Sequence, residues 1–234
     1  IEYDSNGNAH LYYKFDWPYE NYPGGILRAN WWSGLAEGHA ITLLMRASDC
    51  FGEERYMKAA EGFYHSILTS VEEGGSLLDL NGHPWIEEYV DPSAPSEDLS
   101  RVYNGMIYAY FGVKAFEQYK GKYEAAPLLK ESIIKNAQVF DLGYWSYYDA
   151  IGGRANIKYH RVNMALLSDP RIQVPSLEAV TDRWKVGAWL SVPFYLICGA
   201  TGYAKLHFFL AYVFCIFVLY NFISSVYKRA KFHE

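Results

Sequence analysis

The sequence predicts a mainly α fold: a toroid-like (α/α) array of helical hairpins with inserted β-hairpins, plus a C-terminal transmembrane helix. Three observations support this prediction. Apolar residues recur at helical spacing through most of residues 30–185. Two glycine-containing turn motifs interrupt that pattern between aromatic segments. From Val186 to Tyr227, the one charged residue is Lys205.

Several segments show the helical pattern, and short connections join them in pairs. In residues 30–51, apolar side chains recur three or four positions apart from Trp32 to Ala47, and Gly52 follows as a stop signal. Helices joined by short connections pack side by side as hairpins, which is the basis for the predicted array. The predicted helices are 30–51, 53–71, 99–120, 124–140, 162–167 and 176–186.

Two loops between these helices are predicted to form β-hairpins. In the first, Asn81-Gly82 is a strong turn signal because both positions of such a turn require residues that tolerate positive φ. In the second, Gly152-Gly153 lies between two segments rich in aromatic and β-compatible residues. Loops that carry polar and aromatic groups on a rigid scaffold commonly hold the functional residues.

The chain divides into three parts by composition: 1–29, predicted as a linker or the remnant of an N-terminal region, the helical domain 30–185, and a hydrophobic tail over 186–234. Within the tail, residues 206–227 carry no formal charge and are long enough to cross about 30 Å of hydrocarbon. The basic residues that follow predict a cytoplasmic end, hence a single-pass anchor with the helical domain extracytoplasmic or lumenal. Two alternatives stay open: a buried core helix, and a second span over 186–204 that would reverse the sidedness.

Composition excludes several classes of function. A formal net charge of −5 provides no basic surface for nucleic acid, and three cysteines are too few for a disulfide framework. The chain begins at Ile1 without a signal-peptide pattern, so we expect a processed chain or a fragment. Phe, Trp and Tyr make up 18% of the residues, and 22 are tyrosines. Such side chains serve carbohydrate sites, but they are equally common in protein cores.

Polar and aromatic clusters end both predicted hairpins. Tyr89, Tyr148 and Tyr159 carry phenols, which are proton donors at neutral pH unless a nearby cation makes one a base. Glu87 and Glu88 are potential bases, and one of them is expected in the site because adjacent strand residues point to opposite faces. Residue types alone leave a second interpretation open, in which these side chains are a polar strand end and a solvated rim.

Two arginines complete the set. Arg154 and Arg161 can neutralise an anionic substrate bidentately. A carboxylate, several phenols and a guanidinium together suit proton abstraction next to a substrate carboxylate, where the developing negative charge must be stabilised.

Five segments occur in a characteristic order: WWSGLAEGHAI (31–41), PWIEEYVDPSAPSEDLSRVYNGMIYAYFGVKAF (84–116), GYWSYYD (143–149), KYHRVNMALL (158–167) and DRWK (182–185). Together they resemble the C-terminal catalytic domain of the D-glucuronyl C5-epimerases. The resemblance covers residues 31–185 and is closer to bacterial-type members, in which a YHR segment is followed by a short helix.

The resemblance implies that 30–185 is an epimerase-like (α/α) catalytic domain that acts on a uronic-acid polysaccharide, such as a heparosan-like glycosaminoglycan. The family removes the C5 hydrogen of D-glucuronate and returns a proton to the other face, giving L-iduronate. It implies catalytic roles for Tyr89, Tyr148, Tyr159 and Glu88. Tyr148 or Glu88 is expected to abstract the proton and Tyr89 or Tyr159 to deliver one. The expected substrate-binding residues are Glu87, Arg154, His160, Arg161, Trp85 and Asn104.

No cofactor, metal ion or nucleic acid is expected for this chemistry; the expected partners are the polysaccharide and a membrane, and a homodimer stays open. The chain departs from the family at Ile151, where vertebrate-type members carry arginine, and at Asn163, where bacterial members often carry histidine. A substrate carboxylate would then need another cation, such as Arg154 or Arg161. A uronate polysaccharide lyase acting by β-elimination and a non-catalytic glycan-binding membrane protein remain as alternatives.

Overall fold

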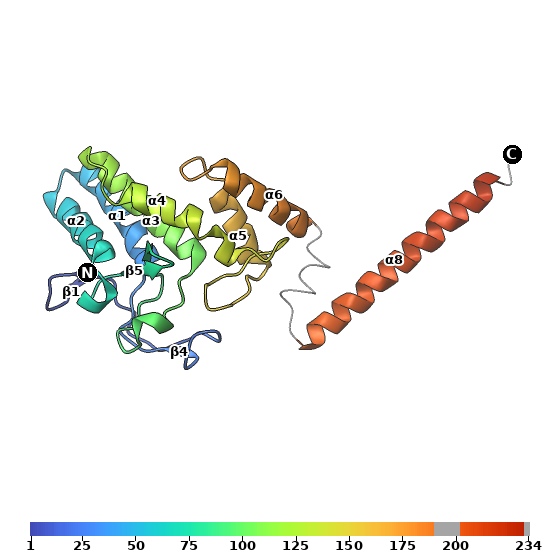
Figure 1. Ribbon diagram of the computed structural model, residues 1–234, viewed down its shortest axis with the longest axis horizontal. Coiled ribbons are helices and arrows are strands. Elements are labelled where there is room, and N and C mark those ends of the chain that lie inside the picture. The colour runs from blue at the N-terminus through green and yellow to red at the C-terminus, as the bar shows by residue number, and fades with distance from the viewer. Residues whose placement is uncertain (190–201, 232–234) are drawn as a thin grey trace.

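The computed structural model describes the backbone of residues 1–189 and 202–231, and the side chains of residues 1–189 and 209–224 (Figure 1). It is mainly helical, as the sequence predicts. The longer helices are α1 (Gly34–Phe51), α2 (Glu54–Leu68), α3 (Tyr103–Lys120), α4 (Ala126–Lys135), α5 (Ile157–Leu167), α6 (Pro175–Trp189) and α8 (Gly202–Lys231). Single 3₁₀ turns form at η1 (Val71–Glu73), η2 (Ser96–Asp98) and η3 (Ala137–Phe140).

The helices pack in neighbouring pairs. Helix α1 lies against both α2 and α3, and α5 lies against α6. The backbones of α1 and α3 can approach closely because Gly112 has no Cβ atom. A Cβ atom at this position would collide with the carbonyl group of Gly38. Helix α1 ends where predicted, at Gly52, whose φ of 69° is the left-handed conformation that glycine adopts readily. The array of helical hairpins therefore agrees with the sequence, while its closure into a toroid remains a prediction.

The first predicted hairpin is confirmed. Strands β5 (Leu77–Leu80) and β6 (His83–Ile86) pair antiparallel, with Leu80 opposite His83. Asn81 and Gly82 form the turn with φ values of 55° and 80°, as a two-residue hairpin turn of this kind requires.

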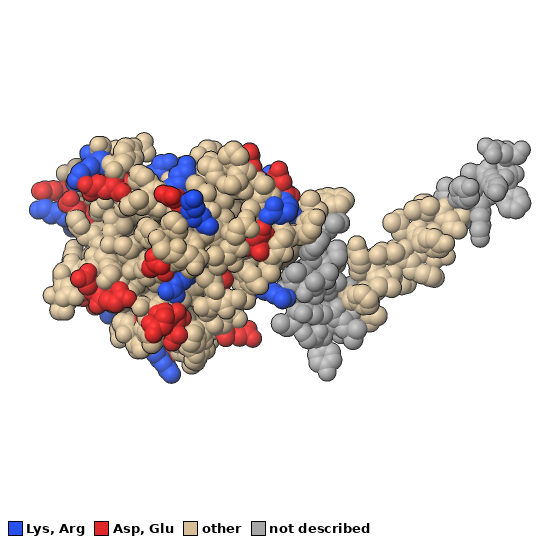
Figure 2. Space-filling model, in the orientation of Figure 1, with Lys and Arg blue, Asp and Glu red and all other residues tan. Residues whose placement is uncertain are grey.

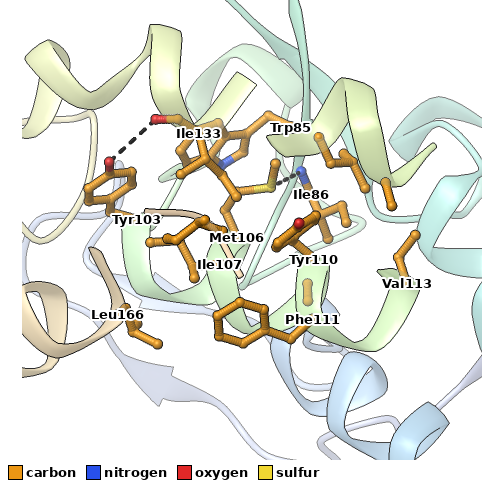
Figure 3. Packing of buried hydrophobic residues seen from close by; sticks show 14 of the residues in the cluster. Trp85, Ile86, Tyr103, Met106, Ile107, Tyr110, Phe111, Val113, Ile133 and Leu166 are labelled. Carbon is orange, nitrogen blue, oxygen red and sulfur yellow. Dashed lines mark hydrogen bonds between the residues drawn. The ribbon is translucent and has the colours of Figure 1, made fainter. Parts of the chain in front are cut away.

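The hydrophobic core joins this hairpin to α3 and α4. Figure 3 shows Trp85 and Ile86 of β6 among the apolar side chains of α3, with the Ile86 N–H donating to Met106 Sδ at 3.2 Å. The ring of Tyr103 stacks on that of Phe140, with centroids 4.2 Å apart. The chain that leaves β6 is therefore held in a defined position relative to the first turn of α3.

The second predicted hairpin takes a different form. An isolated antiparallel bridge joins Tyr147 to Arg154, and the Tyr148 N–H donates to the Gly153 carbonyl at 2.6 Å. Beyond the turn, the predicted strand gives way to α5, because the Asn156 side chain accepts a hydrogen bond from the Tyr159 N–H and caps the helix. Tyr159 therefore lies in the first helical turn rather than on a strand.

Residues 1–29, which the sequence predicts as a linker or remnant, pack against the helices. They form two small antiparallel pairs, β1 (Glu2–Tyr3) with β2 (Ala9–His10) and β3 (Trp17–Pro18) with β4 (Ile26–Leu27). The buried His10 ring lies 2.9 Å from a carboxylate oxygen of Glu37 in α1, and the Ala9 N–H donates to Ser66 Oγ of α2.

The tail contains α8, and between residues 209 and 224 most of its large apolar side chains are exposed. Figure 2 shows the described part of this helix without charged residues, whereas acidic and basic side chains are interspersed over the described surface of residues 1–189 in this view. Among the described residues, no helix is both long and apolar enough to cross a membrane, so the predicted transmembrane helix is not supported. The predicted span over 206–227 extends beyond the described side chains, and the weaker one over 186–204 falls largely on residues 190–201, outside the described residues.

Candidate active site

Three tyrosines that the sequence singles out meet in the structure. The hydroxyl oxygens of Tyr89 and Tyr148 are 2.8 Å apart, within hydrogen-bond distance. The ring centroid of Tyr159 lies 4.7 Å from that of Tyr148. Tyr89 follows β6, Tyr148 lies in the loop before α5, and Tyr159 lies in the first turn of α5. The two insertions thus converge on one group of phenols.

A fourth tyrosine, which the sequence analysis did not select, belongs to the same group. Tyr19 follows β3, and its ring lies 5.4 Å from the ring of Tyr89 and 6.4 Å from that of Tyr148. Its hydroxyl donates to Asp149 Oδ2 at 2.6 Å. The density of aromatic residues between Tyr12 and Tyr22 was the available signal, but the assignment of 1–29 to a linker concealed it. We call Tyr19, Tyr89, Tyr148 and Tyr159 the tyrosine cluster.

Glu87 lies in the core rather than at a substrate surface. Its side chain is fully buried, and its carboxylate accepts hydrogen bonds from Ser100 Oγ, from the Arg101 N–H and from the Tyr89 N–H, at 2.7 to 3.1 Å. Burial raises the pKa of this carboxyl group, and the hydrogen bonds oppose the shift. Its carboxylate thus makes three hydrogen bonds to the chain itself, and the substrate contact expected of Glu87 stays a prediction.

The loop that Glu87 binds is also fixed by Arg101. This residue has a φ of 53°, a left-handed conformation that is uncommon for a residue with a side chain. Its guanidinium donates to backbone carbonyl groups of the same region, namely those of Asp79, Ser96, Glu97 and Leu99. The segment between β6 and α3 is thus held by hydrogen bonds to the Glu87 carboxylate and from the Arg101 guanidinium.

Glu88 occupies a different environment from its neighbour. It is 6% exposed, and its Oε2 atom has no hydrogen-bond partner among the described residues. Burial and the nearby Glu87 raise the pKa of Glu88 to about 8, while a hydrogen bond with the Tyr89 side chain opposes the shift. Gly105 makes room for this carboxyl group, because a Cβ atom there would collide with Glu88 Oε2. Asn104 beside it is buried, and its Nδ2 atom also lacks a partner in the described part of the chain.

Three phenols, those of Tyr19, Tyr89 and Tyr148, are held in their neutral form. Burial raises the pKa of Tyr89, Tyr148 and Tyr19 above the usual value for a phenol, and the nearby carboxylates of Glu88 and Asp149 add to the shift. Asp149 is itself fully buried and accepts a second hydrogen bond from the Gly153 N–H at 2.7 Å. Tyr89 and Tyr148 are therefore proton donors at neutral pH.

Two further residues predicted to bind substrate are core residues. Trp85 is fully buried and stacks on Phe140, with ring centroids 5.4 Å apart. His160 is fully buried and stacks on Trp145 at 4.0 Å, and burial lowers its pKa to about 4, which keeps the imidazole neutral. Both side chains are buried, and the substrate contacts expected of Trp85 and His160 stay predictions. Asn163 belongs to the same buried group and donates to Ser146 Oγ.

The predicted cations, Arg154 and Arg161, are both exposed. A cation that the sequence analysis did not select lies beside the tyrosine cluster: Lys158 Nζ is 5.1 Å from the ring centroid of Tyr159. Within residues 1–189 and 209–224, no group of three or more His, Cys, Asp or Glu side chains is arranged to hold a metal ion.

A pocket of about 270 Å³ opens beside Glu88 and Tyr89. Its other lining residues are Tyr13, Phe15, Trp17, Trp31, Ser33, Leu35 and Ala36, and we call this space the aromatic pocket. A larger cavity of about 480 Å³, at Asp79 and Arg101, contains no member of the tyrosine cluster. The smaller pocket is therefore the one that adjoins the candidate chemistry.

Comparisons with known proteins show which family the chain belongs to. The model of the family described as D-glucuronyl C5-epimerase C-terminus matches residues 6–185. The chain is 33% identical over 161 residues to a protein of Methanocaldococcus jannaschii described as uncharacterized, a match covering 66% of this chain and 50% of that protein. It is 28% identical over 164 residues to the D-glucuronyl C5-epimerase of Caenorhabditis elegans, covering 61% of this chain and 26% of that enzyme. The chain thus spans half or less of the length of these relatives.

Replacing Glu87 tests its structural role. In Glu87→Ala, the donors of Ser100, Arg101 and Tyr89 lose a buried acceptor, at a cost of about 1–3 kcal/mol for each group left unsatisfied. We expect a loss of several kcal/mol in the free energy of unfolding, measured by urea denaturation. The exposed Glu97→Ala, in the same loop, is the control and is expected to change stability by less than about 0.5 kcal/mol. Equal effects of the two substitutions would contradict this assignment.

The raised pKa of Glu88 predicts that the free energy of unfolding depends on pH. Because its pKa is raised in the folded protein, the group contributes stability below its unfolded pKa of 4.5, and this is lost as the pH rises towards about 8. The slope is at most roughly −1.4 kcal/mol per pH unit. Glu88→Gln cannot ionise, so its free energy of unfolding, relative to that of the wild type, should increase between pH 5 and pH 8. Urea denaturation at several pH values measures this difference, and a constant difference would show that the folded-state pKa is not raised.

Proposed function

Since this chain belongs to the family of the D-glucuronyl C5-epimerase C-terminus, we propose that it is an isomerase that inverts C5 of D-glucuronate residues within a polysaccharide. One observation carries the proposal: the hydroxyls of Tyr89 and Tyr148 are 2.8 Å apart, beside a buried glutamate with a pKa of about 8. Inversion at a carbon next to a carboxylate needs one group that takes a proton and another that returns one. The site supplies a carboxyl group and several phenols for these roles.

Glu88 is the better candidate for the base. General base catalysis is most efficient when the pKa of the base lies near the working pH, and a value of about 8 meets this condition. The raised pKa values of Tyr89 and Tyr148 leave too little phenolate at neutral pH for either residue to serve as the base. In the proposed step, ionised Glu88 takes the C5 proton, and the electron pair of the C5–H bond moves into the substrate carboxyl group to form an enediolate.

The second step returns a proton to the other face of C5. The O–H bond of Tyr89 or Tyr159 breaks as the new C5–H bond forms, and water then reprotonates the phenolate while Glu88 releases its proton. The enediolate needs electrostatic stabilisation throughout. Lys158, beside Tyr159, is the proposed source of positive charge, with Arg154 and Arg161 as the alternatives that the sequence suggests.

The proposed substrate is a glucuronate-containing polymer, such as a heparosan-like glycosaminoglycan. A homodimer and a toroidal arrangement of the helices are parts of the same proposal. They rest on the family alone.

Solvent exchange tests the mechanism. An unsulfated glucuronate polymer incubated with the chain in heavy water is expected to incorporate deuterium at C5, which NMR or mass spectrometry measures. Tyr89→Phe or Tyr159→Phe, depending on which phenol delivers the proton, should reduce the exchange rate by at least about 10²-fold, because a positioned acid–base group contributes roughly this much. Tyr119→Phe, an exposed tyrosine of α3, is the control and should retain the wild-type rate.

The outcome separates three functions. Exchange with recovery of intact polymer supports an epimerase. An unsaturated uronate, detected by its ultraviolet absorbance, would identify a lyase acting by β-elimination. Saccharide binding without exchange would identify a non-catalytic glycan-binding protein, and full exchange in both tyrosine variants would remove the phenols from the mechanism.

We also propose that the protein associates with a membrane, with the helical domain on the extracytoplasmic or lumenal side. The exposed apolar side chains of α8, such as Phe214 and Phe217, support this proposal, because soluble surfaces rarely expose large apolar patches.

Vesicle flotation tests the membrane proposal. The full chain is expected to float with phospholipid vesicles in a density gradient. Phe214→Glu combined with Phe217→Glu should reduce the floated fraction, since each buried apolar side chain contributes about 1.5–3 kcal/mol. Phe51→Glu, at an exposed position of α1, is the control and should float like the wild type. A wild-type chain that stays at the bottom of the gradient would refute the proposal.

A further inference from the structure

Tyr19 joins the tyrosine cluster from outside the two insertions. It lies in the loop between β3 and β4, in the part of the chain that the sequence predicts as a linker. Its hydroxyl donates to Asp149 Oδ2 at 2.6 Å, although the two residues are 130 positions apart. Asp149 directly follows Tyr148, so this hydrogen bond connects the N-terminal segment to the backbone that carries another tyrosine of the cluster.

Backbone hydrogen bonds fix the loop that carries Tyr19. The Tyr19 N–H donates to the Gly25 carbonyl at 2.9 Å, and the Tyr22 N–H donates to the Tyr19 carbonyl at 3.0 Å. Gly25 has a φ of 71°, which a glycine adopts at little cost. After β4, the Arg28 N–H donates to the buried carboxylate of Asp91 at 2.8 Å. The Tyr19 side chain is therefore presented from a backbone with a defined conformation.

Asp149 transmits this restraint to Tyr148. Its side chain is fully buried, and its Oδ1 atom accepts from the Gly153 N–H at 2.7 Å, while Oδ2 accepts from Tyr19. The neighbouring backbone is paired as well. The Tyr148 N–H donates to the Gly153 carbonyl at 2.6 Å, and the Tyr103 N–H donates to the Tyr148 carbonyl at 3.1 Å. Asp149 thus ties the loop of Tyr148 both to its own turn and to Tyr19.

Tyr148 contacts both phenols that are candidates for delivering the proton. Its hydroxyl lies 2.8 Å from that of Tyr89, and its ring centroid lies 4.7 Å from that of Tyr159. Proton transfer requires donor and acceptor within hydrogen-bond reach, and a misplacement of about 1 Å can lower a rate by about 10²-fold. A shift of Tyr148 would therefore disturb whichever phenol acts as the proton donor.

We propose that Tyr19 is a positioning residue of the candidate active site. Through Asp149, its hydroxyl sets the position of Tyr148, which in turn orients the phenol that returns the proton to C5. The inference rests on the proposed function for the reaction that these phenols perform. Tyr19 itself does not deliver the proton, because its hydroxyl proton is engaged by Asp149. The hairpin of β3 and β4 is then part of the catalytic unit.

Tyr19→Phe tests the role of the hydroxyl, because it keeps the ring. With an unsulfated glucuronate polymer in heavy water, kcat for deuterium incorporation at C5 is expected to fall roughly 10-fold or more. KM should change by less than about 2-fold, since the hydroxyl acts on the phenols and not on the polymer. An unchanged kcat would overturn the proposal, as would a rise in KM with kcat unchanged.

Tyr22→Phe is the matched control for this experiment. The ring of Tyr22 stacks beside that of Tyr19, with centroids 6.0 Å apart, and its hydroxyl has no hydrogen-bond partner among the described residues. Removing this hydroxyl should leave both kcat and KM at the wild-type values. A loss equal to that in Tyr19→Phe would show that the effect is not specific to the bond with Asp149, and would overturn the proposal.

Asp149→Asn separates position from charge. Asparagine keeps one oxygen for the Gly153 N–H and can donate its amide N–H to the Tyr19 oxygen, so both contacts can form without the negative charge. Exchange should therefore fall less in Asp149→Asn than in Tyr19→Phe. A large loss in Asp149→Asn with the wild-type rate in Tyr19→Phe would assign the effect to the charge of Asp149 and refute the role of Tyr19.

The position of Tyr148 has a readout that needs no substrate. The full chain is labelled with ¹³Cζ-tyrosine and studied by NMR in detergent micelles, where the resonance of Tyr148 is assigned by its loss in Tyr148→Phe. Tyr19→Phe should shift this resonance, and Tyr22→Phe should not. The resonances of the other tyrosines report whether each variant is folded.

The NMR and exchange measurements fail independently. A shifted Tyr148 resonance in Tyr19→Phe, without C5 exchange in the wild type, would refute the proposed epimerase and support the placement of Tyr148 by Tyr19. Normal exchange in Tyr19→Phe would refute the positioning role alone.

Discussion

The buried carboxylate of Glu87 is the interaction on which the candidate site depends. A carboxylate removed from water is strongly destabilising unless hydrogen bonds replace its hydration, and here a hydroxyl and two backbone amides do so. Those donors come from the two ends of one loop, so satisfying the carboxylate also fixes the loop. Arg101 adopts its left-handed backbone within this arrangement, at a conformational cost that the surrounding hydrogen bonds offset. The positions of Glu88 and Tyr89 follow from these constraints.

Asp149 fixes the second insertion through hydrogen bonds to its buried carboxylate, as Glu87 fixes the first. It is buried, accepts from the Gly153 N–H within its own loop and from the Tyr19 hydroxyl across the molecule, and so fixes the backbone next to Tyr148. Each loop therefore pairs a structural carboxylate with a tyrosine of the cluster. The adjacent acids Glu87 and Glu88 differ in their environments. The carboxylate of Glu87 accepts hydrogen bonds from the chain, whereas Glu88 Oε2 has no hydrogen-bond partner among the described residues.

The features that the sequence predicted correctly are local ones. Asn81-Gly82 and Gly52 are read directly because a positive φ depends on the residue itself. The Asn156 cap is equally local, but a pattern of aromatic and β-compatible residues outweighed it, and α5 was predicted to begin too late. The burial of Trp85 and His160 was not predicted, because it depends on the distant partners Phe140 and Trp145. Tyr19 was missed for the same reason, because its hydrogen-bond partner Asp149 is 130 residues away in the sequence.

Position 151 holds isoleucine, so in the proposed reaction the substrate carboxylate must find its cation elsewhere. A guanidinium binds a carboxylate through two parallel hydrogen bonds, whereas Lys158, the cation beside Tyr159, is a point charge on a flexible stem. A point charge orients a carboxylate less strictly, so the orientation of the reacting ring must come from other contacts.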